Sequence, residues 1–318
     1  MVIAHLSDSH IRDTADLRAF ERQLDRIAAG APDHLVLSGD LLDRWKPRLL
    51  ARALDALAAR GLLDAARTTI IHGNHDLQSS GGHPRSRRDL PRLVLRAWDL
   101  PPLIAARRRR FYAAIERRAP GVAPSSAAWK GLFVKDLGSL SIAALDTIPL
   151  PWTPIRIRGG RMQARLAAGC VRDGQVEALA RALPTGKPAL LVLHHYPLPV
   201  APIRWGRRLE VVMEIPERDR RKLWAAARAA GVRLVLCGHV HRARLEWHEG
   251  IAVGLQGESG AAWAGRSIAW YRLVGDDVRM NLERTAWRLR STSDTSARPT
   301  SAAGAAAARR TRCSSDGS

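Results

Sequence analysis

The sequence predicts an α/β protein in which buried strands alternate with amphipathic helices. Two observations support this fold class. Short apolar runs recur along the chain, and each is about as long as a buried strand. Segments with apolar residues at helical spacing separate many of these runs. In a chain of 318 residues with 46% hydrophobic residues, this alternation indicates a layered α/β fold with a sizeable core.

Six apolar runs are the expected core strands. They are Val2–Leu6, His34–Ser38, Thr68–Ile71, Leu140–Leu145, Ala189–Leu193 and Val232–Cys237. Four further runs follow Cys237 with short turns between them, and we expect them to form an antiparallel meander in a second sheet. These later runs are Leu245–His248, Ile251–Leu255, Ile268–Val274 and Val278–Leu282.

Helices are expected between these strands. One carries Leu17, Phe20, Leu24 and Ile27, and a second carries Leu50, Leu54 and Leu57 before Gly61 ends it. Asp173 is the expected cap of a third helix, and a fourth is expected from Pro216 to Gly231.

The composition suggests one domain and a tail. We expect a single domain over residues 1–290, with a basic insert at about 78–128, and a disordered tail over 291–318, where large apolar residues are nearly absent. The chain has no run of about 18 apolar residues, no secretory signal pattern and no metal-finger spacing of its three cysteines. These features predict a cytoplasmic protein without disulfides.

The net charge of +21 allows two interpretations. One is a nucleic-acid or anionic membrane surface. The other, which we favour, is a compositional bias together with a locally basic pocket, because arginine greatly outnumbers lysine and alanine is abundant. The run Arg107–Arg110 is interpreted as a solvated helix face. In the alternative, the neighbouring Phe111 and Tyr112 stack on a base or touch lipid.

Five of the apolar runs are followed immediately by residues whose side chains can bind metal. If these strands share a sheet, the residues meet at its carboxyl edge, where α/β proteins bind ligands. Gly39, Gly73 and Gly238 each precede one of these residues, and glycine permits a close backbone approach. The five groups are Asp8 with His10, Asp40 with Asp43, Asn74–Asp76, His194 with His195, and His239 with His241.

The donor types indicate the class of metal. Carboxylate, amide and imidazole groups suit Mn²⁺, Fe or Zn²⁺ and do not match a cysteine-rich structural zinc site. They are too many for one ion and suit two ions about 3.5–4 Å apart that share a carboxylate. Asp43 is the exception, because we expect it to pair with Arg44 and brace its loop.

The motifs D-x-H, G-D-x-x-D-R, G-N-H-D, H-x-x-P and G-H-x-H, in this order, resemble those of the calcineurin-like metallophosphoesterase family. Within that family, the chain is most similar to bacterial class III cyclic-nucleotide phosphodiesterases. The resemblance spans roughly Val2 to Arg242. It implies a four-layer αββα sandwich, in which two mixed β-sheets flanked by helices hold a dinuclear metal centre.

The resemblance also assigns roles to residues. It implies that His75 contacts the phosphoryl group or protonates the leaving oxygen, and that Asp76 orients His75. The family usually has His-x-Pro or His-His-Pro-Pro where this chain has His194-His195-Tyr196-Pro197; we take His194 as the ligand and keep His195 as the alternative. The implied metal ligands are Asp8, His10 and His241 for the first ion, Asp40 as the bridge, and Asn74, His194 and His239 for the second.

The expected activity is hydrolysis of a phosphodiester, or of a phosphomonoester, by a metal-bridging hydroxide. The basic inserts, at about 78–128, 149–171 and 199–216, favour an anionic substrate such as a cyclic nucleotide, a nucleotide diphosphate ester or a phospholipid headgroup. The alternatives are a DNA nuclease of the same superfamily and a non-catalytic scaffold. The sequence shows no coiled-coil or capping segment for the nuclease, and its complete motif set disfavours the scaffold. The sequence does not determine the oligomeric state.

Overall fold

The computed structural model describes residues 1–79, 100–127, 131–149, 155–165, 167–183, 186–205, 209–257, 266–275 and 277–285. These residues all belong to a compact unit, Met1–Ala286. The expected tail over 291–318 and residues 80–99 of the basic insert lie outside the described residues. Among the helices in the described ranges, none has the length and apolar character needed to cross a bilayer.

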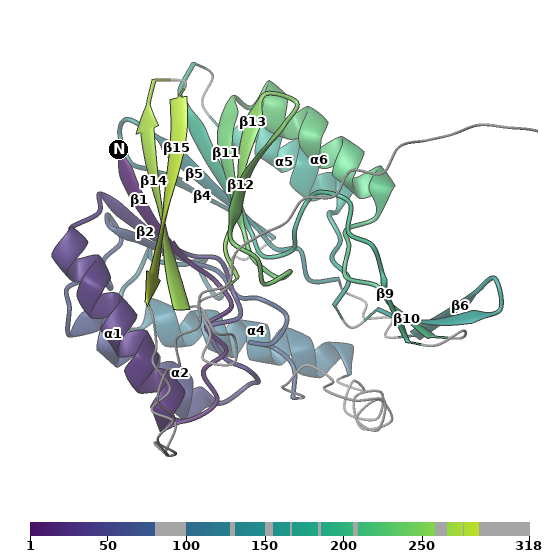
Figure 1. Ribbon diagram of the computed structural model, residues 1–318, viewed down its shortest axis with the longest axis horizontal. Coiled ribbons are helices and arrows are strands. Elements are labelled where there is room, and N and C mark those ends of the chain that lie inside the picture. The colour runs from purple at the N-terminus through teal and green to yellow at the C-terminus, as the bar shows by residue number, and fades with distance from the viewer. Residues whose placement is uncertain are drawn as a thin grey trace, which may run out of the picture. The chain divides into compact units, whose positions relative to one another are not determined.

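The first sheet contains the amino-terminal strands, in the order β15-β14-β1-β2-β3 (Figure 1). Strands β1, β2 and β3 are parallel, while β14 runs antiparallel to β1 and to β15. Their carboxyl ends therefore lie at one edge of the sheet. The strands are β1 (Val2–Leu6), β2 (His34–Leu37), β3 (Thr68–Ile70), β14 (Arg266–Val274) and β15 (Asp277–Thr285).

The second sheet has the order β12-β13-β11-β8-β5-β4. Its four inner strands are parallel, and β4 and β12 form antiparallel edges. The strands are β4 (Leu132–Asp136), β5 (Ser141–Leu145), β8 (Ala189–Leu193), β11 (Val232–Cys237), β12 (Arg244–His248) and β13 (Ile251–Leu255).

The prediction of one meander after Cys237 is wrong. The last four strands form two hairpins that join different sheets: β12 and β13 extend the second sheet beside β11, and β14 and β15 extend the first sheet beside β1. Each hairpin covers a strand edge that would otherwise expose unpaired backbone groups. The sequence predicts the strands but does not determine which sheet each hairpin joins.

Helices cover the outer faces of both sheets, as Figure 1 shows. Residues of α1, α2 and α4 pack with the first sheet in one apolar cluster, and residues of α5 and α6 pack with the second sheet in another. A third cluster lies between the sheets and contains Ile3 and Val36 from one and Leu190 and Leu234 from the other. The predicted four-layer αββα sandwich is confirmed. The helices are α1 (Thr14–Gly30), α2 (Pro47–Ala58), α4 (Pro101–Glu116), α5 (Asp173–Ala182) and α6 (Glu217–Ala229).

Two expected helix starts shift by one residue. Asp173 is the first residue of α5, and Arg172 occupies the cap position. Pro216 is the cap of α6, which begins at Glu217. In α1 the side chain of Asp13 accepts hydrogen bonds from the backbone N–H groups of Ala15 and Asp16, an arrangement that stabilises a helix start.

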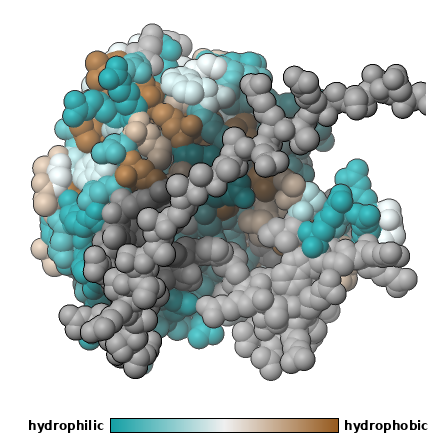
Figure 2. Space-filling view, viewed as in Figure 1, coloured by the Kyte–Doolittle hydropathy of each residue, from teal (hydrophilic) through white to brown (hydrophobic). Residues whose placement is uncertain are grey.

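Two inserts form a small third sheet with the strand order β6-β7-β10-β9. Its strands are β6 (Ile155–Arg158), β7 (Arg161–Ala164), β9 (Ile203–Trp205) and β10 (Leu209–Val211). Glu210 forms ion pairs with Arg161 at 2.7 Å and Arg204 at 3.6 Å. In Figure 2, the coloured atoms of this sheet are mainly hydrophilic on the face in view.

The arginine run of α4 is only partly solvated. Arg109 and Arg110 are exposed, as predicted, but Arg107 and Arg108 are each only 8% exposed. Phe111 and Tyr112 lie in the core beside the first sheet, at 0% and 1% exposure. The alternative in which these two rings stack on a base or touch lipid is therefore wrong.

Candidate metal centre

The five groups of candidate ligands meet at one edge of the sandwich, but not within one sheet. Three groups follow β1, β2 and β3 of the first sheet, and two follow β8 and β11 of the second. The expectation of a single shared sheet is thus corrected: the carboxyl edges of two facing sheets supply the site. Within the described residues, three groups of donor atoms lie close enough to hold a metal ion; two are separate sets, and the third, His10, Asp40 and His75, shares a residue with each of them.

The first set is Asp8, His10 and His241. The Nε2 atom of His241 lies 3.1 Å from Oδ1 of Asp8 and 3.1 Å from Nε2 of His10. The distance from His10 Nε2 to Asp8 Oδ1 is 3.7 Å. Asp8 and His10 are buried and His241 is half-buried, so this set lies at the border of the solvent.

The second set is Asp40, His194 and His239, all buried. His194 Nε2 lies 3.2 Å from Oδ2 of Asp40 and 3.2 Å from Oδ1 of Asn74. The Nε2 atom of His239 is buried and has no hydrogen-bond partner in the described part of the chain. A buried imidazole nitrogen with a free lone pair beside a carboxylate fits a metal ligand.

Asp40 lies between the two sets. Its Oδ2 atom is 3.9 Å from Nε2 of His10 and 3.2 Å from Nε2 of His194. Its other oxygen, Oδ1, accepts a hydrogen bond from the backbone N–H of His75 at 2.8 Å. One carboxylate thus faces donors of both sets, which is the arrangement that a bridged pair of ions requires.

The backbone at this edge adopts a conformation that side chains disfavour. Seven described residues other than glycine have a positive φ. Five of them are candidate ligands: Asp8, His10, Asp40, His239 and His241, with φ between 44° and 75°. Such conformations cost free energy and are concentrated at functional sites.

Glycines bring the loops close to the candidate ligands. A Cβ atom on Gly73 would lie 2.2 Å from Oδ1 of Asp40, and one on Gly238 would lie 2.2 Å from Oδ2 of Asp8. Gly39 has a φ of +108°, and a Cβ there would lie 2.6 Å from Nδ1 of His194. At all three positions any side chain would displace a candidate ligand.

Burial and neighbouring charges set the protonation states at this edge. Burial alone would raise the pKa of Asp8, but hydrogen bonds with His10 and His241 hold it well below its usual value. Burial would lower the pKa of His194, yet Asp40 raises it to about 9. Burial, followed by the charge of His194, lowers the pKa of His239 to about 3. An ionised Asp8 and a neutral His239 are the forms that bind metal, whereas His194 would have to lose its proton when an ion binds.

His75 is oriented by a different group from the one expected. Its Nδ1 atom lies 2.9 Å from the backbone carbonyl oxygen of Asp43, which can only accept, so Nδ1 carries the proton. The Asp76 carboxylate instead accepts from the backbone N–H groups of Leu41, Leu42 and Gly73. The expectation that Asp76 orients His75 is therefore corrected, and Asp76 fixes the loops around Asp40 and Gly73.

Asp43 also differs from expectation. Its Oδ1 atom lies 3.9 Å from Nδ1 of His10, while Arg44 is exposed. Asp43 thus contacts two site histidines, His10 through its carboxylate and His75 through its backbone carbonyl.

The two adjacent histidines after β8 face different partners. His194 lies against Asp40 and Asn74, whereas His195 Nδ1 shares a 2.7 Å hydrogen bond with Oγ1 of Thr147. The geometry therefore places His194, and not His195, within the second set of donors.

Sequence reasoning missed Asp146 and Thr147. They follow β5 directly, in the same position as the other groups, and both are buried at this edge. Asp146 lies 3.7 Å from Nε2 of His72, and Thr147 contacts His195. The apolar run Leu140–Leu145 also ends in polar residues, so the rule applied to the other five strands would have found them.

Comparisons with known proteins bear on the fold. No curated protein sequence matches the chain. A dimetal phosphatase from Danio rerio is 11% identical with a TM-score of 0.57, over 89% of this chain and 96% of that chain. The phosphopantetheinyl hydrolase from Mycobacterium tuberculosis is 13% identical with a TM-score of 0.36, over 82% of this chain and 89% of that chain. At these identities, the likeness to the first structure shows a shared fold alone.

The family comparison covers most of the chain. The family model described as calcineurin-like phosphoesterase matches residues 1–243, the part that contains every candidate ligand. Members of this family are metal-dependent phosphoric ester hydrolases. The chain therefore belongs to the calcineurin-like phosphoesterase family.

Proposed function

We propose that this phosphoesterase hydrolyses a phosphodiester of an anionic substrate with two metal ions bound at the carboxyl edge. One observation carries the proposal: Asp40 faces donors of two separate sets, with His10 on one side and His194 on the other. A single-ion site would not need both sets.

The residues fit two ions of the borderline type. Asp8, His10 and His241 would hold the first ion, Asn74, His194 and His239 the second, and Asp40 both. The mixture of carboxylate, amide and imidazole donors suits Mn²⁺, Fe or Zn²⁺. When bound, such ions neutralise the charge of the phosphoryl group and activate a water molecule as nucleophile.

The protein itself orients the reacting groups. The hydrogen bond from the His75 backbone to Asp40 fixes the direction of that carboxylate. The Asp43 carbonyl accepts from Nδ1 of His75, so a proton passed to the leaving oxygen would come from Nε2 of the doubly protonated ring. His75 is half-buried, whereas Asp40, Asn74, His194 and His239 are buried. This exposure suits a residue that donates a proton to the leaving oxygen.

The substrate class rests on charge and resemblance. The basic inserts favour an anionic substrate over a neutral one. The resemblance to class III cyclic-nucleotide phosphodiesterases favours a diester, so we propose a cyclic nucleotide or a phospholipid headgroup. The structural neighbour from Danio rerio is a dimetal phosphatase, which makes a monoester the alternative to be tested. A cytoplasmic location remains part of the proposal.

A substrate panel tests this function. The full chain, loaded with Mn²⁺, is assayed with bis-p-nitrophenyl phosphate, p-nitrophenyl phosphate, cyclic nucleotides, a glycerophosphodiester, and single- and double-stranded DNA. We expect hydrolysis of the small diesters, and its loss after chelation of the metal. Full activity in a chelated sample would overturn the proposal. A preference for DNA that weakens steeply with salt would replace it with the nuclease alternative.

A further inference from the structure

A buried ion cluster lies behind the second set of donors. Asp146, at 0% side-chain exposure, forms an ion pair of 3.0 Å with Arg108 of α4. Arg172 lies 3.5 Å and His72 lies 3.7 Å from the same carboxylate. The backbone carbonyl of Asp146 accepts a hydrogen bond from Gln175 at 2.8 Å. A buried carboxylate that lost its cation would be strongly unfavourable, so this cluster fixes the position of Asp146.

Two neighbouring arginines of α4 contact both sheets at the carboxyl edge. Arg107 donates a hydrogen bond of 2.9 Å to the backbone carbonyl of Leu77, in the loop that follows β3 of the first sheet. Arg108 reaches Asp146, which follows β5 of the second sheet. The insert helix thus ties together the loop that carries Asn74 and the loop that carries Asp146.

A chain of contacts leads from this cluster to the second set of donors. Thr147, the neighbour of Asp146, contacts Nδ1 of His195 through its hydroxyl at 2.7 Å. The ring of His195 lies against the rings of His239 and His194, with centroid distances of 4.4 Å and 5.3 Å. His72, which precedes Gly73 and Asn74, contacts Asp146 from the other side.

We propose that Arg108 is a positioning residue for the second metal ion, acting through Asp146, Thr147 and His195 on His239 and His194. This inference rests on the proposed function, because it takes these histidines as metal ligands. Groups that orient metal ligands without touching the ion change metal affinity when they are removed. The contacts traced above reach His195 and, through its ring, His239 and His194, which belong to the second set of donors.

The inference explains why two arginines of a solvent-facing run are buried. The Nε and Nη2 atoms of Arg108 are buried and make no hydrogen bond to the described residues, so this side chain satisfies only part of its own hydrogen-bonding capacity. Burial of a partly satisfied guanidinium is unfavourable by itself. In our account, the buried guanidinium is retained because it fixes the position of Asp146.

The test measures metal binding directly. The metal-free full chain is titrated with Mn²⁺ by calorimetry and by electron paramagnetic resonance of the free ion, which gives two stepwise dissociation constants. The variant Asn74→Ala identifies the step that belongs to the second ion. We expect Arg108→Met to weaken that step by roughly 10- to 100-fold and to leave the other step unchanged.

Three further variants separate positioning from folding. Arg109→Met removes an exposed arginine from the next position of α4 and should leave both constants unchanged. Arg108→Lys keeps the charge and should recover most of the affinity. Thr147→Val removes the hydroxyl that contacts His195 without removing a charge, and it should weaken the second step even where Arg108→Met does not fold.

The outcomes distinguish the two proposals. If the wild-type chain binds two ions and Arg108→Met and Thr147→Val bind both with wild-type affinity, the positioning role is overturned while the metal centre stands. Equal weakening of both steps in the two variants would also overturn it, because a general loss of structure would explain that result. If the wild-type chain binds fewer than two ions, the proposed function fails first, and this inference fails with it.

Discussion

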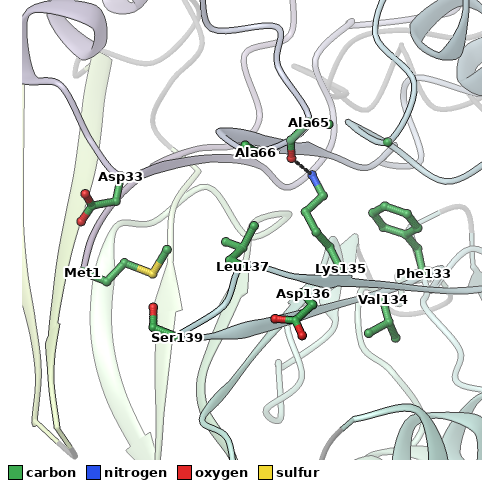
Figure 3. Close-up of a pocket in the computed structure, with 11 residues that line it drawn as sticks. Met1, Asp33, Ala65, Ala66, Phe133, Val134, Lys135, Asp136, Leu137 and Ser139 are labelled. Atoms are coloured by element: carbon green, nitrogen blue, oxygen red, sulfur yellow. Dashed lines mark hydrogen bonds between the residues drawn. The ribbon is translucent and has the colours of Figure 1, made fainter.

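The two edges of the sandwich differ in how their polar groups are satisfied. At the amino edge, a pocket of about 940 Å³ lies among Met1, Asp33, Ala65, Lys135 and Asp136 (Figure 3). Lys135 donates to the carbonyl oxygens of Ala65 and Thr68, at 2.8 Å and 2.7 Å. Asp33 accepts from the backbone N–H of Val2 at 2.6 Å.

The carboxyl edge shows the opposite arrangement. Asp8 and Asp40 bring two buried carboxylates next to several imidazoles, and His239 Nε2 has no hydrogen-bond partner among the described residues. The backbone there is also strained, whereas the amino edge has an open hollow whose charged groups are bonded to the protein itself. The comparison teaches that the proposed metal-binding edge is recognised by its convergent donor groups, and not by the size of a pocket.

The largest effect should come from the shared carboxylate. Replacement of Asp40 by Ala removes the group that faces both donor sets, so we expect phosphodiesterase activity to fall by roughly 1,000-fold or more. Steady-state rates with bis-p-nitrophenyl phosphate and excess Mn²⁺ measure it. The matched variant at the amino edge is Asp33→Ala, which should retain activity. Equal losses in both variants would remove the distinction between the edges.

A smaller loss is expected for His75→Ala. A general acid contributes about 100-fold or more to the rate when the leaving group needs a proton. The loss should therefore be large for an alkyl diester and much smaller for a nitrophenyl ester, whose leaving group departs as a stable anion. The ratio of kcat values for the two substrates is the measurement. The same loss with both leaving groups would assign His75 to another task, such as binding of the phosphoryl oxygens.

The close approach of Gly73 to Asp40 predicts a cost in stability. A Cβ atom at this position would lie 2.2 Å from Asp40 Oδ1, so Gly73→Ala should lower the free energy of unfolding by about 1–3 kcal/mol. Gly174 in α5 has open space around it, and Gly174→Ala should be neutral or slightly stabilising. Urea unfolding of both variants checks the prediction. A stable Gly73→Ala with normal metal binding would show that the loop relaxes freely.

The last prediction concerns stability at the amino edge. Burial lowers the pKa of Lys135 to about 8. Since an unfolded lysine has a pKa of about 10.4, the unfolded chain binds more protons between these two values, and stability should rise with pH in this window. Lys135→Met should lack this gain. Its melting temperature relative to wild type should therefore fall as the pH increases from about 8 to about 10. A difference that is independent of pH would contradict this account.

The sequence predicts the strands and the candidate ligands because both depend on local order. A polar residue directly after an apolar run, such as Asp8 or His239, must lie at a strand end whatever the tertiary structure. The same rule, applied to the run before Asp146, would have added that residue. Local order also predicts that the backbone at Gly73 approaches a candidate ligand closely, because a candidate ligand follows Gly73 in the sequence.

The features that the sequence does not predict depend on contacts between distant segments. Nothing near Asp76 in the sequence shows that its carboxylate would bond to backbone groups of Leu41 and Leu42, 34 to 35 residues away. The burial of Arg108 could be predicted only with the knowledge that Asp146 lies opposite α4. Likewise, the hairpin β14–β15 could join either sheet until its pairing with β1 is known.

Anomalous diffraction from crystals grown with Mn²⁺ tests the central claim most directly. The account predicts two peaks at the carboxyl edge, about 3.5–4 Å apart, with Asp40 between them. One peak should lie beside Asp8, His10 and His241, and the other beside Asn74, His194 and His239. A single peak at this edge, or metal bound only in the pocket beside Lys135, would contradict it.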